Sequence, residues 1–323
     1  MALTFTVPST ELSATLANRR GGIIDNIFEK AVFLSMMKMH GGVKMETGGD
    51  TLNTPLRMSK NSSSGSFVDY DLLDVTPQDV ITTAQYNWAG LYATISISWM
   101  EEQKNSGRHQ VFSLLQSKID DARDTIRDKL NVQLLASQPG AGSKDLQSIS
   151  ELIDIDPTDN PPRGSVGGIT TATSANTWWR NKYDTGGSFT VSAMNTKFND
   201  VSQAAERPHF VLTDQTVYQY YENSQTGQIR YASTNVADAG FVSLQFKGIP
   251  VVYDPQIGVT GAMYFINTDF LKLTIHTGGD FVMKDFVEPD NQAARTAKIL
   301  FMGQLEVSNR RREGVISAIT APA

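Results

Sequence analysis

The chain has 323 residues, of which 40% are hydrophobic and none is cysteine, and it carries a formal net charge of -6 at pH 7. This composition supports a folded core of one elaborate or two ordinary domains. It argues against a protein that holds nucleic acid through bulk positive charge, and it excludes disulfides, thiolate nucleophiles and cysteine-ligated metals. The sequence shows no apolar run long enough for a membrane helix and no signal-peptide pattern at its N-terminus.

The first 42 residues are predicted to form an arm that leads into a helix. Residues 1 to about 20 are polar and irregular. Over 23–39, apolar residues recur at helical spacing, and the stripe consists of Ile24, Ile27, Phe28, Ala31, Leu34 and Met37. Gly41 and Gly42 are then expected to end the helix.

Residues 43–76 are predicted to form a long, polar β-hairpin. Two short extended pieces, 54–58 and 67–73, are separated by the polar run 60–66, which has the composition of a turn. A hairpin with so few apolar residues is only marginally stable in isolation. We therefore expect it to lie on another subunit, although the segment alone is equally compatible with a flexible surface insertion.

A strand and a very long helix are predicted next. In 92–100, the apolar residues that alternate with polar ones are Ala93, Ile95, Ile97 and Trp99. This period of two predicts a half-buried strand. The segment 110–137 has one apolar stripe, formed by Val111, Leu114, Leu115, Ile119, Ala122, Ile126, Leu130 and Leu134. At about 1.5 Å per residue the helix would be roughly 40 Å long, so strand and helix predict a connected frame and not a pocket.

The second half of the chain begins with loop-rich sequence that enters a compact α+β unit. In residues 138–190, the neighbours Trp178 and Trp179 are predicted to be buried at a packing or interface position. Helices are then predicted at 192–206, with a serine cap, and at 214–222, and strands at 209–213, 246–253, 261–267 and 271–276. Two final strands, 296–307 and 314–319, are expected to return to the frame around the long helix.

Residues that could carry chemistry are few and scattered. The sequence contains no nucleophile elbow, phosphate loop, dinucleotide-binding motif, zinc-protease motif or EF-hand loop. No metal-ligand spacing relates the four histidines, which are His40, His109, His209 and His276. The side chains of Glu101 and Glu102 point in different directions, so they are poor candidates for paired-carboxylate catalysis. We predict no catalytic residue, no cofactor and no metal.

Two groups of residues are candidates for subunit contacts. The dense basic cluster Arg310, Arg311 and Arg312 could meet phosphate or an acidic neighbour. Because Glu306 and Glu313 flank it, an ion-paired strand surface or a subunit contact is the favoured interpretation. The aromatic candidates, for which ordinary core packing is an equally good interpretation, are Phe67, Trp88, Trp99, Trp178 and Trp179.

The order of these elements resembles the major capsid proteins of tailed bacteriophages, which have the Hong Kong 97-like fold. The stretches that carry the resemblance are TPQDVITTAQYNW (76–88), ISISWMEEQKNSG (95–107), DKLN (128–131), VGGI (166–169), NTWWRNKY (176–183), DAGFVSLQFKGIPVVYD (238–254), GAMYFINTDFLKL (261–273) and EPDNQAARTAKILFMGQLEVSNRRREGV (288–315). None is a catalytic motif, so the resemblance rests on their number and order. It covers nearly all of the chain after Gly41.

The resemblance implies an α+β fold with four parts. These are an N-terminal arm (1–42), an extended loop over a neighbouring subunit (43–90), a peripheral domain (91–150 and 288–323) with the spine helix 110–137, and an axial domain (151–287). The acidic net charge suits a shell that encloses DNA without gripping it.

The resemblance also implies a structural protein and not an enzyme. The chain would assemble with itself, as pentamers and hexamers, into an icosahedral head around double-stranded DNA that it does not bind sequence-specifically. A separate scaffolding protein, a portal and possibly a decoration protein would be its partners. Its location would be the virion, after assembly in the host cytoplasm. An encapsulin-like compartment is the alternative within this fold, and a hydrolase with an acidic site assembled by the fold is the alternative from another class.

Some members of the resembled family lock their shells through a Lys–Asn isopeptide bond that a glutamate promotes. The candidates here would be Lys60, near the predicted hairpin tip and also a candidate interface residue, and Asn309, close in sequence to Glu306 and Glu313. The surrounding motif is not matched, so we do not expect this link.

Overall fold

The computed structural model describes residues 31–104, 114–137, 144–158, 165–171, 173–225, 244–290 and 292–322. These residues form two compact units. Unit 1 contains the described residues within 92–128 and 281–301, and unit 2 contains the rest. The boundary between the units falls inside strand β4 (Ala89–Ser98), inside helix α4 (Leu114–Leu135) and inside strand β14 (Ala294–Val307).

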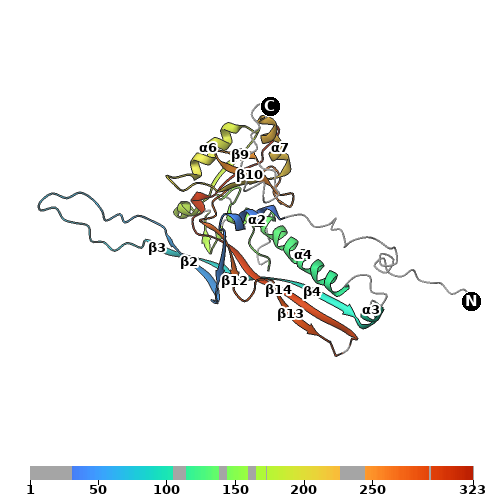
Figure 1. The fold of residues 1–323 in the computed structure, drawn as a ribbon. Helices are drawn as coiled ribbons and strands as arrows, with labels where there is room; N and C mark the ends of the chain where they lie inside the picture. Colours follow the sequence, from blue (N-terminus) through green and yellow to red (C-terminus); the bar gives the residue numbers. More distant parts are fainter. Residues whose placement is uncertain are drawn as a thin grey trace, which may run out of the picture. The chain divides into compact units, whose positions relative to one another are not determined.

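A six-stranded sheet forms the centre of unit 2 (Figure 1). From edge to edge its strands are β7 (Lys182–Thr185), β15 (Gly314–Ser317), β11 (Met263–Ile266), β8 (Phe210–Thr213), β10 (Ile249–Tyr253) and β9 (Leu244–Phe246). Every residue of β8, β11 and β15 is buried, as expected for inner strands that are covered on both faces. The predicted strands at 209–213 and 261–267 are confirmed, while the predicted strand 246–253 is two strands joined by a tight turn at Lys247 and Gly248.

Helices α6 (Val191–Val201) and α7 (Gln215–Ser224) share one face of this sheet, because their apolar residues belong to the same core as Val211 of β8. The predicted serine cap of α6 is wrong. Thr190 caps the helix by accepting a hydrogen bond from the backbone N–H of Ala193 at 3.2 Å. The Asp214 carboxylate caps α7 in the same way, which satisfies a backbone donor that has no partner inside the helix.

Helix α2 (Val32–Met39), the described end of the predicted arm helix, is also part of unit 2. Its Phe33 ring lies 6.4 Å from the ring of Phe210 in β8. The buried residues of α2 are Val32, Phe33, Met36 and Met37. Of the predicted stripe, Met37 is therefore buried as expected, whereas Ala31 and Leu34 are only partly buried, so the centre of the buried face was predicted in the wrong place. The error arose because apolar residues nearly encircle this helix, and the periodicity fits more than one face. Gly41, with φ of 67°, ends the helix as predicted, whereas 23–30 lies outside the described residues.

The last strand of the sheet corrects another prediction. Gly314–Ile319 was expected to pair with the frame around the long helix. Instead β15 lies inside the six-stranded sheet, antiparallel to β11 and parallel to β7. Its four buried residues require a covered position, and a strand's own sequence does not specify which neighbour supplies that cover.

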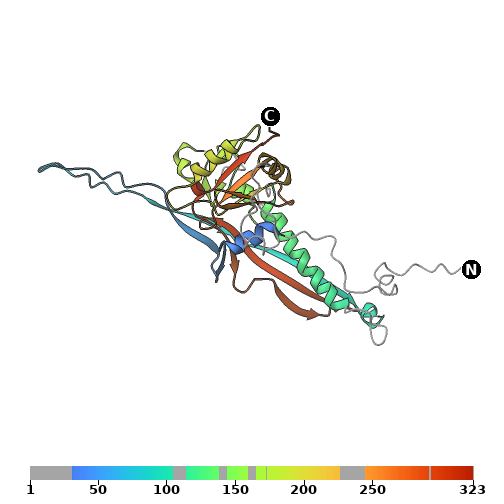
Figure 2. The ribbon, with the colours of Figure 1, turned by 45° about the horizontal axis from the view of Figure 1, so that its top comes forward.

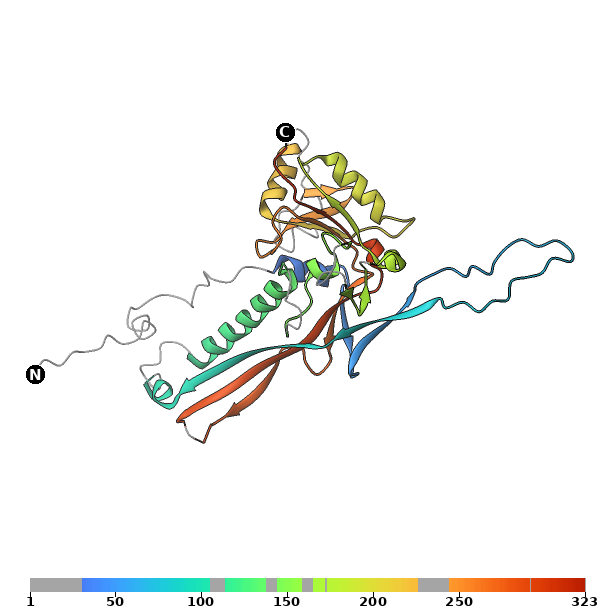
Figure 3. The same cartoon turned by 180° about the vertical axis from the view of Figure 1, so that it is seen from behind.

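The predicted hairpin exists, with a different return strand. Strand β2 (Thr51–Arg57) pairs antiparallel with β3 (Ile81–Asn87) over its full length. The loop 58–80 continues the hairpin beyond the paired residues (Figures 1 and 3). Residues 67–73, which were predicted to be extended, lie in this loop and form no strand pairing with any of the described residues. Strand β1 (Val43–Glu46) is not part of the hairpin, since it pairs parallel with β12 (Leu271–His276).

The remaining elements of unit 2 are short. The second half of β14 pairs antiparallel with β12. The other short segments are α5 (Ile149–Leu152), β5 (Ser165–Val166), β6 (Ile169–Thr170) and the 3-10 helices η2 (Ser174–Trp179) and η3 (Arg310–Arg312).

Unit 1 is built on long strands beside a long helix. Strand β14 pairs with β4 (Ala89–Ser98) and with β13 (Val282–Val287), which was not predicted. Helix α4 runs alongside β4 and β14 in all three views (Figures 1, 2 and 3). The predicted apolar stripe of α4 is confirmed from Ala122 to Leu134, where its members are buried; residues 110–113 of the predicted helix lie outside the described residues. Trp99 is not an inward residue of the strand, because α3 (Trp99–Lys104) begins there and leaves its side chain 58% exposed.

Candidate subunit interface

The loop 58–80 exposes a row of large apolar side chains. The row consists of Phe67, Val68, Tyr70, Leu72, Leu73 and Val75, and the side chains of Tyr70 and Leu72 are fully exposed. Single exposed apolar residues are ordinary, but a contiguous run of this kind is typical of a surface that another molecule covers. Of this row, only Phe67 was predicted from the sequence to be an interface residue. The other members carried a detectable signal, apolar residues concentrated in a polar loop, which was interpreted as a strand.

The same loop is acidic. One lysine, Lys60, and four aspartates, Asp69, Asp71, Asp74 and Asp79, give it a formal charge of 1 - 4 = -3. All five side chains are exposed. The loop therefore presents apolar groups and negative charges together, which suits a partner surface that is both apolar and basic.

Hydrogen bonds within the loop give it a defined shape. The Asp71 carboxylate accepts the backbone N–H of Val68 at 2.9 Å. The Asp74 carboxylate accepts both the side-chain hydroxyl of Thr76 at 2.6 Å and its backbone N–H at 3.0 Å, which lowers the pKa of Asp74. The Ser63 hydroxyl donates to the backbone carbonyl of Thr76 across the loop. Such turns reduce the conformational entropy that the loop would lose on binding.

Polar contacts with β14 anchor the base of the hairpin. The buried Tyr86 hydroxyl donates to the Val307 carbonyl at 2.8 Å, and burial raises the pKa of this phenol. The Gln304 side-chain amide donates to the Asn87 carbonyl at 2.8 Å. The Glu306 carboxylate accepts hydrogen bonds from Thr54 of β2 and from Thr274 of β12. The hairpin therefore leaves unit 2 from a fixed base.

Trp88 belongs to this base. Its indole N–H donates to the Gly49 carbonyl at 3.0 Å, and its ring meets the His276 imidazole edge-on with centroids 5.6 Å apart. The side chain is half-buried. Trp88 thus contacts both the connection between β1 and β2, at Gly49, and the end of β12, at His276. Part of its side chain remains accessible to a neighbouring molecule.

Two predicted interface residues lie in the interior of unit 2. The Trp179 side chain is 2% exposed, and its indole N–H donates to the Val166 carbonyl. Arg310 is fully buried, and its guanidinium donates to the carbonyls of Leu152 and Trp179 and to the side-chain oxygen of Asn181. Neither side chain is available to a neighbouring subunit in this conformation, because packing and hydrogen bonding within the chain consume both.

The rest of the basic cluster is accessible. Arg311 is exposed, while Arg312 is partly exposed and pairs with Glu206 at 2.6 Å. Arg312 also donates to the side chain of Gln203. Trp178 is partly exposed beside Trp179, with ring centroids 5.5 Å apart. The three arginines thus point into three different environments, which their adjacent positions in the sequence do not reveal.

Next to this cluster, Glu313 is a buried acid without a cationic partner in its hydrogen bonds. Its carboxyl group accepts the backbone N–H of Asn267 at 3.0 Å. Burial raises the pKa of Glu313 well above its ordinary value. The side chain is therefore a structural acid that favours its neutral form, and not a promoter of chemistry at the surface.

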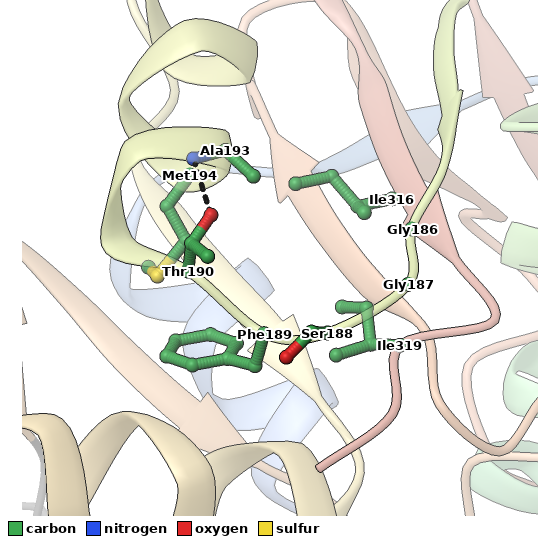
Figure 4. Close-up of a pocket in the computed structure, with 9 residues that line it drawn as sticks. All are labelled: Gly186, Gly187, Ser188, Phe189, Thr190, Ala193, Met194, Ile316 and Ile319. Atoms are coloured by element: carbon green, nitrogen blue, oxygen red, sulfur yellow. Dashed lines mark hydrogen bonds between the residues drawn. The ribbon is translucent and has the colours of Figure 1, made fainter. Parts of the chain in front are cut away.

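A small apolar pocket lies at the start of α6 (Figure 4). It is lined by the turn Gly186–Gly187 and by apolar side chains, including those of Phe189, Met194, Ile316 and Ile319. Its volume is about 20 Å³, little more than one water molecule needs and far less than a substrate site. The described residues contain no group of three His, Cys, Asp or Glu side chains placed to hold a metal. Within the described ranges, no helix has the length and hydropathy that crossing a membrane requires.

Comparison with known proteins gives matches by structure alone. No protein-family model and no curated protein matches the sequence. A chain of the cyanophage A-1(L) capsid is similar over 96% of this chain and 98% of its own, with 17% identity and a TM-score of 0.71. A capsid chain of a native GTA particle matches with 9% identity and a TM-score of 0.63, over 99% and 100% of the two chains. The SrpI encapsulin of Synechococcus elongatus PCC 7942 matches with 8% identity and a TM-score of 0.61, over 97% and 96%.

These likenesses cover whole chains and identify the class of fold. The chain has the α+β, Hong Kong 97-like fold of tailed-bacteriophage major capsid proteins, which encapsulins share. The resemblance expected from the sequence is therefore confirmed at the level of the fold.

Proposed function

We propose that this protein is the major capsid protein of a tailed bacteriophage, which assembles with itself into the icosahedral head around double-stranded DNA. The observation that carries the proposal is the exposed apolar row of the loop 58–80, on a hairpin with a fixed base, in a chain with a capsid fold. An exposed apolar surface of this kind typically marks a site that another molecule covers. In a shell, a neighbouring copy of the chain covers it.

The parts of the chain would have the roles expected for this fold. Residues 1–42 would be the arm and 43–90 the extended loop. The peripheral domain would comprise 91–150 with 288–323, and 151–287 would be the axial domain, which meets its copies in pentamers and hexamers. A scaffolding protein, a portal and possibly a decoration protein would act with it, during assembly in the host cytoplasm and in the virion. This role requires no catalysis.

Electron microscopy of the purified full-length chain tests the proposal. The chain is imaged in negative stain, alone and with the product of any neighbouring scaffold gene, over a range of salt and protein concentrations. Closed shells, or regular pentamers and hexamers, are the expected result. Monodisperse monomers under all of these conditions would contradict the proposal.

A hairpin variant sharpens the test. Residues 58–80 are replaced by Asn-Gly, a pair that suits a tight turn between β2 and β3. The variant should keep the melting temperature of the folded chain and lose assembly, because only the exposed loop is removed. The control is Arg123→Ala on the exposed face of α4, which should assemble normally. An enzyme or a binding module would survive the loop replacement with its activity intact.

Shell contents separate the proposal from its alternative within the fold. Shells isolated from the natural source should contain double-stranded DNA if the chain is a phage capsid protein. Shells that instead contain an enzyme and no DNA would identify an encapsulin-like compartment.

A further inference from the structure

Two histidines join the end of helix α2 to the central sheet of unit 2. His40 caps the C-terminus of α2, and His209 directly precedes β8. Their imidazole rings are stacked, with centroids 5.5 Å apart and planes 6° from parallel. The His40 ring also stacks on the buried ring of Phe210, with centroids 6.0 Å apart. The end of α2 is therefore held on the sheet by ring contacts of His40.

Both histidines contact Thr268, which is buried in the turn between β11 and β12. The Thr268 hydroxyl donates to the His40 carbonyl at 2.9 Å and lies 2.7 Å from Nδ1 of His209. The backbone N–H of Thr268 donates to the same Nδ1 at 3.2 Å. Because a backbone N–H can only donate, this hydrogen bond requires an imidazole without a proton on Nδ1, which is the neutral form. We refer to His40, His209 and Thr268 as the histidine clasp.

A positive charge on His40 would be poorly accommodated. A charged imidazole carries a proton on both ring nitrogens. Nε2 of His40 is buried, and no described residue forms a hydrogen bond with it. Burial and the neighbouring His209 lower the pKa of His40. The C-terminus of α2 and the face of the Phe210 ring both favour a cation, but the lowered pKa shows that burial and the second imidazole outweigh them.

The charged groups around the clasp give little compensation. The exposed carboxylate of Asp269 lies 3.8 Å from Nε2 of His209 and would pair with it once that imidazole is charged. The Lys272 ammonium group donates to the Gly41 carbonyl at 2.9 Å, so a positive charge already lies at the end of α2. The other titratable side chains on the elements packed here are Lys38 of α2, Arg207 before β8, Asp254 at the start of α2, and Glu313, which accepts the backbone N–H of Asn267.

We infer that the histidine clasp is an acid-sensitive switch, which holds the C-terminal end of α2 on unit 2 near neutral pH and releases it when the imidazoles are protonated. The N-terminal end of the helix should stay attached. There the buried Asp254 carboxylate accepts the backbone N–H of Phe33 at 3.3 Å and the side-chain amide of Asn131 at 3.2 Å. Acid would thus loosen one end of α2 without unfolding unit 2. The switch is a property of the single chain, so it does not rest on the proposed function.

The direction of the pH dependence follows from His40. Its pKa in the docked state is lower than its ordinary value of 6.5, so the released end of the helix binds a proton more tightly than the docked end does. Docking is therefore fully favourable above pH 6.5 and weakens as the pH falls below this value.

Hydrogen exchange of the full-length chain at a fixed protein concentration tests the switch. Mass spectrometry follows the backbone amides of α2 at about pH 7.5 and about pH 5.5, and each exchange rate is divided by the intrinsic rate at that pH. The opening equilibrium constant of residues 36–40 should increase by about threefold or more at the lower pH. The amides of α7, a helix without histidine on the same sheet, should be equally protected at both pH values.

Two variants remove a charge and keep the packing. His40→Phe retains an aromatic ring against Phe210 and should make the protection of α2 independent of pH. His209→Asn retains an acceptor for the Thr268 N–H and should reduce the response to pH. The matched control is His276→Gln, at a histidine that contacts Trp88, and it should respond as the wild type does. Thermal melts report whether each variant folds, and His40→Gln replaces His40→Phe if that variant does not.

Three outcomes would overturn the switch. The first is equal protection of α2 in the wild type at both pH values. The second is a wild-type response to pH in both His40→Phe and His209→Asn. The third is a simultaneous loss of protection in α2 and α7 at the lower pH, which would identify unfolding of the whole unit. A chain that shows the expected response and never forms shells would contradict the proposed function and support the switch.

Discussion

Arg310 illustrates how a charged residue can serve the interior of a capsid-fold domain. Its guanidinium meets the carbonyls of Leu152 and Trp179 and the side chain of Asn181, so segments that are far apart in the sequence converge on one side chain. Burial lowers the pKa of Arg310 to about 10, which still leaves the group charged at neutral pH. Asp154, itself buried, lies close enough to favour the charged form.

Replacing Arg310 with methionine should destabilise unit 2 strongly. The substitution leaves three hydrogen-bond acceptors and the nearby Asp154 without the cation, which typically costs about 3–5 kcal/mol. Arg310→Lys should rescue little, because an ammonium group cannot reproduce the planar fork of donors. The adjacent Arg311→Met is the control and should change stability by about 0.5 kcal/mol or less. Urea unfolding measures the free energy of unfolding of the three variants. Equal losses of stability in Arg310→Met and Arg311→Met would refute the structural role of Arg310.

The buried side chain of Glu313 should make the stability of the folded chain depend on pH. The pKa of this acid is raised in the folded state, so the folded chain binds a proton more tightly than the unfolded chain does. Its contribution to stability is therefore fully present below its ordinary pKa of 4.5 and is lost as the pH rises above it. Glu313→Gln mimics the neutral acid and should raise the melting temperature at pH 8 by about 2–4 °C.

The pH dependence distinguishes this effect from a general gain in stability. The melting temperatures of wild type and Glu313→Gln should converge as the pH falls below 4.5, where the glutamate itself becomes neutral in both the folded and the unfolded state. The control is Glu222→Gln, at an exposed position of α7, which should follow the wild type at every pH. A constant offset between wild type and Glu313→Gln would contradict the assignment.

At the scale of elements, the β5–β6 turn makes a close contact with the extended hairpin. Gly167 and Gly168 both have positive φ, but only at Gly167 would a Cβ atom collide with the chain, 2.7 Å from the Ala84 Cβ of β3. The Gly167 carbonyl also accepts the backbone N–H of Gln85 at 3.0 Å. The turn and the strand are therefore fitted to each other at backbone level.

Alanine substitutions at Gly167 and Gly168 should destabilise the folded chain to different extents. Gly168→Ala introduces backbone strain of roughly 1–2 kcal/mol, with open space around the new methyl group. Gly167→Ala introduces a similar backbone strain and, in addition, the collision of the new methyl group with β3. It should therefore lower the free energy of unfolding by more than Gly168→Ala does. Calorimetry of the pair measures the difference, and Gly167→Ala should also reduce assembly if β3 shifts. Equal destabilisation would show that the contact with Ala84 is unimportant.

The elements also show what the sequence could predict. The apolar stripe of α4, the strand β12 and the helix α7 followed from clear periodicities, because their partly buried positions impose one. The return strand of the hairpin was misplaced for an opposite reason. In β3 only Ala84 and Tyr86 are buried, so its pattern is weak, whereas the apolar residues of 67–73 gave a strong pattern by facing outwards.

The candidate interface was predictable only in part. Residue types led to the prediction of Phe67 and the arginine cluster as interface residues. Burial, however, depends on contacts between distant segments, and these contacts place Arg310 and Trp179 inside unit 2. The cross-strand pairing of Lys284 with Lys298 was not predicted either, because the two residues become neighbours only through the register of β13 and β14. Sequence periodicity reports which residues face a core, and it does not report which strands lie side by side.

At the scale of the whole molecule, mature shells should remain free of covalent links between chains. Asn309 is engaged as the cap of η3, where its side chain accepts the backbone N–H of Arg311 at 3.2 Å. Glu313 is fully buried, and Glu306 accepts hydrogen bonds from two threonines within its own chain. A denaturing gel of mature shells should therefore show a single monomer band. A ladder of oligomers that disappears in Lys60→Arg would contradict this expectation.

The inner position of β15 has a consequence for biosynthesis. The six-stranded sheet contains a strand that leaves the ribosome more than a hundred residues after β8, yet β15 separates β7 from the other strands. We expect chains stalled on the ribosome before residue 310 to be protease-sensitive in unit 2, and chains released beyond residue 317 to be resistant; early resistance would refute this order. Translation would then act as a checkpoint. A nascent chain in which β15 has not yet been synthesised can present its hairpin loop but has no finished unit 2, so it lacks a folded surface with which another chain could associate.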